Sequence, residues 1–101
     1  MSNGIENKVI LITGGSTGLG AETARFLASR GAKVAVAARR KTKLDEVVTD
    51  IHANGGTARA YELDVTDKAQ VEATVAAVVA DFGKIDVLIN NAGLMPIRPM
   101  A

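Results

Sequence analysis

The sequence predicts a single α/β domain, residues 1–101, built around a parallel β-sheet. Apolar, strand-like runs alternate with helix-like segments along the chain, and this alternation is typical of parallel strands joined by crossover helices. The first run, residues 9–13, is apolar at nearly every position, as expected for a central strand covered by helices on both faces. It leads directly into residues 14–20, which contain four glycines.

The glycine-rich turn predicts an anion site. Glycine permits a tight turn and a close approach of a ligand to the backbone. The following helix, about residues 21–30 and ending at Gly31, would begin with free N–H groups and a positive dipole end. Phosphate is the natural ligand of such a turn.

The middle of the chain predicts a second strand and a second helix. Residues 33–38 form another apolar run, which we expect to be a buried strand. Residues 43–53 carry apolar side chains at helical spacing, and the run 54–56, Asn-Gly-Gly, ends that helix.

The last elements follow the same alternation. Residues 57–63 alternate in the manner of an edge strand. Asp67 and Gln70 have the spacing of a capping box at the start of a third helix, which Gly83 closes. Residues 85–90 are expected to form a fourth, mostly buried strand. The apolar seam of the third helix is expected to comprise Val71, Val75, Val78, Val79 and Phe82.

Right-handed crossovers restrict the topology. If the third crossover returns past the first strand, the strand order is 3-2-1-4, with two helices on one face of the sheet and one on the other. Residues 14–20 and 91–93 then meet at the switch point, where ligands bind in open sheets. The fourth strand would be an open edge, so Val87 and Ile89, or their neighbours, would be underburied.

The composition excludes several classes of function. The formal net charge is +1, which indicates no basic field for nucleic acid. There is no cysteine and only one histidine, His52, so neither a disulfide framework nor a metal site is expected. No apolar run is long enough to span a membrane, and we expect a cytoplasmic protein whose partner is a small molecule.

Three glycine templates can be compared with this turn. A nucleotide-hydrolase loop requires Lys and Ser/Thr where Ala21 and Glu22 stand, and G-x-G-x-x-G does not match either. The observed pattern, T-G-x-x-x-G-x-G over residues 13–20, resembles the cofactor loop of the short-chain dehydrogenase/reductase family, classical type. Asp64-Val65 and the Asn-Asn-Ala-Gly run at 90–93 resemble two further elements of that family, so the resemblance extends over residues 8–93.

The resemblance implies the amino-terminal half of a Rossmann-like, three-layer αβα fold that is truncated relative to the full family fold. It also implies three groups of cofactor-binding residues. Thr13 and Asn90 have two open roles, contact with the cofactor or cross-linking of strand ends, and Asp64 could instead only cap its loop. The implied groups are Gly14, Ser16, Thr17, Gly18, Leu19 and Gly20 at the pyrophosphate and ribose, Asp64 and Val65 at the adenine, and Asn91, Ala92 and Gly93 at the nicotinamide-side ribose.

The end of the second strand predicts the cofactor. An acidic residue there binds the ribose hydroxyls of NAD, whereas arginine accepts the 2′-phosphate of NADP. This sequence has Ala38 at that position, followed by Arg39, Arg40 and Lys41, so NADP(H) is preferred over NAD(H). The alternative interpretation of residues 39–41 is a solvated charge run. Thr17 also departs from the basic residue that many NADP-preferring relatives carry at that position.

No catalytic residue is assigned. The family's chemistry resembles general-acid catalysis by a tyrosine with a lysine four residues later, but Val65 follows the only tyrosine, Tyr61, at that spacing. We therefore expect Tyr61 to be a packing or surface residue and the catalytic half to be missing from this chain. The leading hypothesis is the cofactor-binding half of an oxidoreductase, completed by the missing half. The alternative is a non-catalytic nucleotide-binding fragment, or one that associates with another copy along the open sheet edge.

Overall fold

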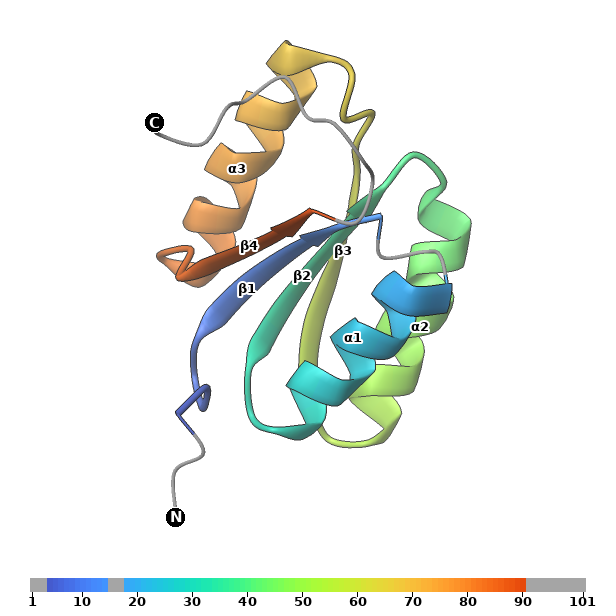
Figure 1. Cartoon of the computed structure of the whole chain (residues 1–101), viewed down its shortest axis with the longest axis vertical. Helices are drawn as coiled ribbons and strands as arrows, with labels where there is room; N and C mark the ends of the chain where they lie inside the picture. The colour runs from blue at the N-terminus through green and yellow to red at the C-terminus, as the bar shows by residue number, and fades with distance from the viewer. Residues whose placement is uncertain (1–3, 15–17, 91–101) are drawn as a thin grey trace.

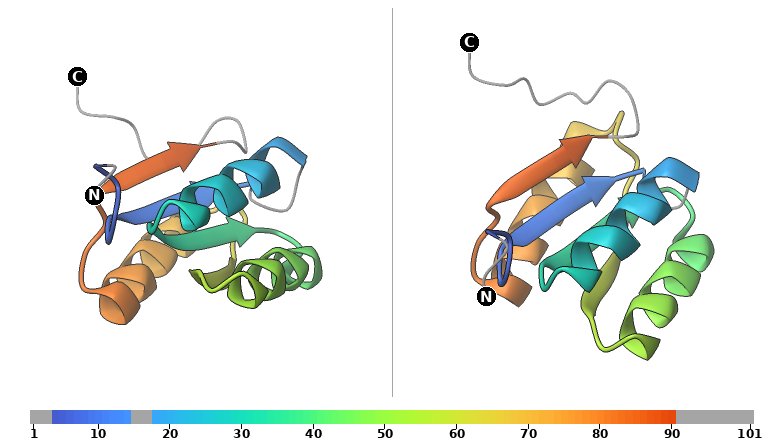
Figure 2. Two further views of the ribbon diagram at one scale, coloured as in Figure 1. Left: turned by 90° about the horizontal axis from the view of Figure 1, so that it is seen from below. Right: turned by 60° about the horizontal axis from the view of Figure 1, so that its bottom comes forward.

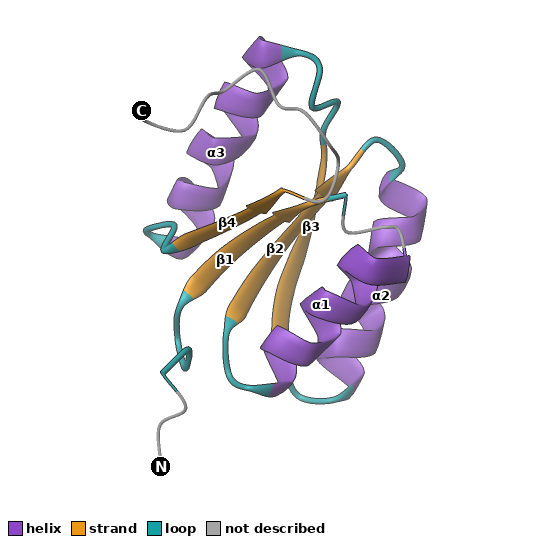
Figure 3. Cartoon of the chain, viewed as in Figure 1, coloured by secondary structure: helices purple, strands orange, loops and turns teal. Residues whose placement is uncertain are grey.

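The computed structural model describes residues 4–14 and 18–90 and has the predicted α/β architecture (Figure 1, Figure 3). A four-stranded parallel sheet has the order β3-β2-β1-β4, which confirms the predicted 3-2-1-4 topology. The elements, in chain order, are β1 (Val9–Thr13), α1 (Gly18–Ser29), β2 (Lys33–Ala38), α2 (Lys41–Ala53), β3 (Thr57–Glu62), α3 (Lys68–Phe82) and β4 (Val87–Asn90).

The two faces of the sheet are covered as predicted. Alternate side chains of a strand point to opposite faces, so each central strand contributes to two cores. Ile10 and Ile12 of β1 join the core beneath α1 and α2, whereas Leu11 joins the core beneath α3. Figure 2 shows α3 on the side of the sheet opposite α1 and α2. The apolar pattern of β1 therefore arises because both of its faces are buried.

Register brings the carboxyl ends of the strands to one edge of the sheet. Thr13 pairs with Ala37 of β2 and with Asn90 of β4. Ala38, the last residue of β2, pairs with Glu62, the last residue of β3. The residues that follow these strands consequently start from the same edge, which is where ligands bind in open parallel sheets.

The ends of α3 match their predicted signals. The Asp67 carboxylate accepts a hydrogen bond from the Gln70 N–H at 3.2 Å, and Gly83 ends the helix in the left-handed region with φ 89°. The predicted apolar seam is wrong at Val79, which is 42% exposed. Val71 and Val78 lie one on top of the other against the sheet, and Thr74 fills the position between them. Val79 lies about 100° further round the helix than Val78, outside this stripe.

The fourth strand is shorter and less covered than the sequence predicted. The mostly buried strand expected over residues 85–90 is β4, residues 87–90, whose Val87 and Leu88 are 44% and 47% exposed. Within the described part of the chain, β4 pairs with β1 alone, so one of its edges is open. The underburial expected at Val87 and Ile89, or their neighbours, is confirmed, because Val87 and the neighbouring Leu88 are the exposed side chains. Asp86, just before β4, accepts a hydrogen bond from the Val9 N–H at 2.8 Å.

Candidate functional site

The site begins where β1 and β4 end. The buried Thr13 hydroxyl donates a hydrogen bond to Asn90 Oδ1 at 2.8 Å. Of the two roles left open for these residues, the structure shows the cross-link between strand ends. The Gly14 N–H donates to the carbonyl of Ala37 at 2.7 Å, and Gly14 has φ +73°, a conformation that glycine adopts without steric cost. The chain therefore leaves β1 through a turn that needs glycine at its first position.

The start of α1 lies just beyond this turn. Gly18 is the first residue of the helix, and a Cβ placed on it would meet no atom within 4 Å, so open space adjoins it. Leu19 is 70% exposed, whereas Gly20 is buried. The first N–H groups of a helix have no partner within the helix, and the dipole makes this end positive. The donors and the open space fit a pyrophosphate group.

Part of the predicted site lies outside the described residues. Ser16 and Thr17 in the turn are outside them, and so are Asn91, Ala92 and Gly93 after β4. Among the predicted pyrophosphate residues, the structure places Gly14, Gly18, Leu19 and Gly20 at the carboxyl end of β1.

A second group of residues surrounds a hollow at the ends of β2 and β3. The hollow has a volume of about 320 Å³ and is lined by Arg39, Glu62, Asp64 and Gln70. Arg39 follows β2, Glu62 ends β3, Asp64 lies in the next loop and Gln70 is in the first turn of α3. No sequence motif indicated Glu62, and Gln70 was predicted only as part of the cap of α3. The pairing of Ala38 with Glu62, which only the structure shows, places this carboxylate at the same strand ends as Arg39.

Asp64 is held in a defined orientation. One carboxylate oxygen, Oδ1, accepts hydrogen bonds from the Thr66 hydroxyl at 2.6 Å and from the Thr66 N–H at 2.9 Å. These two bonds, with a smaller effect from the charge of Arg39, hold the pKa of Asp64 below its usual range. Within the described ranges, Oδ2 has no hydrogen-bond partner. Asp64 therefore caps its loop and still presents an ionised oxygen that can accept a hydrogen bond from a ligand.

Val65, the other predicted adenine residue, has a different environment. Its side chain is 9% exposed and belongs to the core beneath α3, together with Leu63 and Val71. The Val65 side chain thus packs in the core and offers little surface to a ligand.

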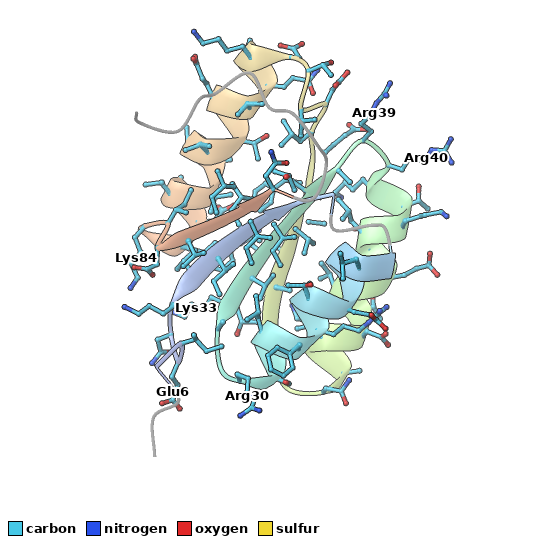
Figure 4. All side chains as sticks on the ribbon, viewed as in Figure 1. Glu6, Arg30, Lys33, Arg39, Arg40 and Lys84 are labelled. Atoms are coloured by element: carbon cyan, nitrogen blue, oxygen red, sulfur yellow. The ribbon has the colours of Figure 1, made fainter. Side chains whose placement is uncertain are left out.

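Two arginines follow β2, and the first of them, Arg39, lines the hollow. Arg39 and Arg40 are exposed and project away from the body of the chain where β2 ends (Figure 4). Neither forms an ion pair with any residue in the described ranges, whereas neighbouring Lys41 pairs with Asp45 at 3.8 Å. Ala38, at the position that an acidic residue would occupy in an NAD-specific site, is a buried residue. Arg39 and Arg40 can therefore both turn towards an anion without breaking an existing ion pair.

Tyr61 lies in β3 and faces α3. Its hydroxyl donates a hydrogen bond to Asp81 Oδ2 at 2.6 Å. Burial, followed by this hydrogen bond and the negative charge of Asp81, raises the pKa of Tyr61 above its usual range. A catalytic tyrosine needs the opposite shift. The structure agrees with the packing or surface role predicted for Tyr61.

Comparison with known proteins identifies the family. The sequence profile described as short chain dehydrogenase matches residues 8–101. The chain belongs to the short-chain dehydrogenase family. It is 44% identical over 97 residues to an oxidoreductase of Listeria monocytogenes, and this match covers 96% of the chain but 39% of the relative.

Solved short-chain dehydrogenase structures have the same fold. A metagenomic short-chain oxidoreductase in complex with NADP superposes with a TM-score of 0.84 at 40% identity, over 89% of this chain and 41% of the other. An NAD⁺-bound xylitol dehydrogenase gives 0.85 at 40% identity, over 89% of this chain and 35% of the other. The described residues thus form the Rossmann-like, NAD(P)-binding region of a short-chain dehydrogenase.

Among residues 4–14 and 18–90, no helix is long and apolar enough to cross a membrane.

Proposed function

We propose that this chain is the NADP(H)-binding half of a short-chain oxidoreductase. The complete protein would transfer hydride between the cofactor and a carbonyl or alcohol substrate, the nicotinamide ring supplying or accepting the hydride. The preference for NADP(H) depends on one observation, namely that Arg39, which lines the hollow with Asp64, and the adjacent Arg40 form no ion pair with any described residue. A cytoplasmic location, which the cysteine-free composition favours, is part of the same proposal.

Charge and geometry support the choice of NADP(H) over NAD(H). The 2′-phosphate of NADP is an anion, and guanidinium groups bind phosphate through paired, charge-assisted hydrogen bonds. Ala38 provides no carboxylate that would repel this phosphate. The Glu62 carboxylate lines the same hollow as Arg39, so the phosphate is expected to lie on the Arg39 side of it.

The remaining cofactor contacts follow the family pattern. In this proposal the turn and the start of α1 hold the pyrophosphate, Asp64 accepts a hydrogen bond from the adenine amino group, and residues 91–93 lie beside the nicotinamide-side ribose. The residues proposed for the pyrophosphate and the adjoining ribose are Gly14, Ser16, Thr17, Gly18, Leu19 and Gly20.

Titration of the purified chain with NADPH and NADH tests the proposal. Replacing both arginines, Arg39→Ala and Arg40→Ala, should weaken NADPH binding by about tenfold or more, because each charge-assisted hydrogen bond contributes about 1.5–3 kcal/mol before screening at an exposed site. NADH binding should change by less than about threefold. Equal losses for the two cofactors would overturn the assignment to NADP(H).

A matched control removes the same number of positive charges elsewhere. Arg30 and Lys33 lie at the opposite end of the sheet from Arg39 and Arg40 (Figure 4). The double variant Arg30→Ala, Lys33→Ala has the same net charge as the test variant. It should leave the ratio of NADPH to NADH affinity unchanged, which separates a local phosphate contact from the overall field of the chain.

The exposed apolar side chains support a complete form that continues beyond β4. Leu88 lies on the open edge, Phe26 of α1 is 56% exposed on one side of the sheet, and Val79 of α3 is 42% exposed on the other. The rest of a short-chain dehydrogenase would supply a strand for the edge and helices for both faces. The chain covers 39% of its Listeria relative, so about this much of such a protein is present. We propose that the chain alone has no turnover, and carbonyl-dependent NADPH oxidation by the purified chain would refute this.

The open edge also supports a second candidate function. A strand edge with exposed Val87 and Leu88 can pair with another copy of the chain instead of with a further part of the same protein. In that case the chain would be a self-associating, nucleotide-binding fragment without catalysis.

A further inference from the structure

Gln70 connects the loop that contains Asp64 to the first turn of α3. Its side-chain Oε1 accepts a hydrogen bond from the Asp64 N–H at 3.0 Å. Its Nε2 donates to Asp67 Oδ2 at 3.2 Å, and its backbone N–H donates to Asp67 Oδ1, also at 3.2 Å. Only one orientation of the Gln70 amide satisfies both neighbours, because the N–H of Asp64 needs an acceptor and the carboxylate of Asp67 needs a donor.

Ordinary helix capping does not require the bond to Asp64. The reciprocal partner in a capping box is the N-cap residue, which here is Asp67. Gln70 reaches three residues further back, beyond the cap, to the backbone of Asp64. Gln70 also lines the hollow that Arg39, Glu62 and Asp64 surround. The side chain therefore lies between the end of a helix and the residue proposed to contact adenine.

We propose that Gln70 is a positioning residue for adenine recognition, because it fixes the backbone from which the Asp64 carboxylate is presented. This inference rests on the proposed function. Thr66 orients the carboxylate within the loop through Oδ1, and Gln70 anchors the same loop to α3 at the Asp64 N–H. Without the Gln70 bond, the Asp64 N–H has lost its acceptor and the loop is held to the start of α3 by the bond from the Asp67 N–H to the Asp64 carbonyl at 3.0 Å. The position of the Asp64 Oδ2 relative to the hollow is then less narrowly defined.

The variant Gln70→Leu tests this role, since leucine is of similar size but has no hydrogen-bonding group. Loss of one hydrogen bond corresponds to a loss of affinity of roughly three- to tenfold. Because both cofactors carry adenine, Gln70→Leu should weaken NADPH and NADH binding by the same factor, unlike the arginine variants. The double variant Asp67→Asn, Gln70→Glu keeps an acceptor for the Asp64 N–H, exchanges donor and acceptor between residues 67 and 70 and leaves the net charge unchanged, so it should restore affinity to within about threefold of the wild type.

A cofactor analogue separates positioning from general loss of structure. Reduced nicotinamide hypoxanthine dinucleotide phosphate has an oxygen in place of the adenine amino group, so it lacks the amino donor proposed to bind Asp64. The wild-type chain should bind NADPH more tightly than this analogue, and Gln70→Leu should reduce that preference by roughly three- to tenfold. The matched control, Ala69→Leu, adds an exposed leucine in the same helical turn and should leave the preference unchanged.

The possible results are distinguishable. A reduced preference for NADPH over the analogue in Gln70→Leu, restored in the double variant Asp67→Asn, Gln70→Glu, supports the positioning role. The same preference in the wild type and Gln70→Leu overturns it, even if the melting temperature of the variant falls. If the wild-type chain shows no saturable binding of NADPH or NADH, the proposed function is overturned and this inference with it.

Discussion

The hydrogen bond between Thr13 and Asn90 is expected to stabilise the chain measurably. Thr13 is completely buried, and its hydroxyl donates to Asn90 Oδ1 at 2.8 Å across β1 and β4. The substitution Thr13→Val keeps the size and β-branching of the side chain and removes the donor. The lost hydrogen bond and the poorer solvation of Asn90 cost about 2 kcal/mol, and the additional buried methyl group returns about 0.8 kcal/mol. We expect a net loss of about 1 kcal/mol in the free energy of unfolding.

The chain contains its own control for this prediction. Thr74 of α3 is 6% exposed, and its hydroxyl has no hydrogen bond with any residue in the described part of the chain. The same change, Thr74→Val, therefore removes a buried hydroxyl that has no partner, and it should leave the stability unchanged or raise it by about 0.5–1 kcal/mol.

Urea denaturation followed by circular dichroism measures both variants on one scale. For a domain of this size, 1 kcal/mol corresponds to a change of about 4–8 °C in melting temperature, which provides an independent readout. If Thr13→Val is as stable as Thr74→Val, the bond between the strand ends does not contribute to stability and the reasoning is wrong.

Two other predictions concern acid stability and association. The hydrogen bond from Val9 N–H, and next the contact with Lys84, keep the pKa of Asp86 below its usual value of 3.8. Its charged form therefore stabilises the fold above about pH 4, and this contribution is lost as the pH falls through the lowered pKa. Asp86→Asn should reduce the acid-induced loss of stability, measured as the free energy of unfolding at successive pH values. A steeper loss in Asp86→Asn would contradict this sign. Leu88→Lys should abolish concentration-dependent association of the chain in analytical ultracentrifugation, and an unchanged association constant would show that copies do not meet along β4.

Much of the fold could be read from local patterns. Residues 33–38 were predicted as a strand and form β2 with the same bounds. The capping signal of Asp67 and the left-handed Gly83 were both predicted as the ends of α3. Such features depend on the conformational preferences of a few neighbouring residues, so the linear sequence is sufficient to locate them. The handedness of crossovers then leads from the order of elements to the strand order.

The residues of the candidate site could be predicted from the sequence one loop at a time. Gly14, Gly18, Arg39 and Asp64 were selected from motifs and from their places after predicted strands, and the structure puts the described members of this set at one edge of the sheet. Their cofactor roles remain a prediction, which the titrations above address.

Contacts between distant segments needed the folded structure. The choice between the two roles left open for Thr13 and Asn90 depends on strand register. The position of the Glu62 carboxylate beside Arg39 and the bond from the Asp64 N–H to Gln70 depend on strand register and on the placement of α3. No periodicity contains this information, because register and helix placement result from packing the whole core at once. The sequence therefore identifies which loops lie at the carboxyl ends of the strands, where the cofactor site is proposed. The strand register and the packing of α3 against the sheet determine which side chains from different loops meet there.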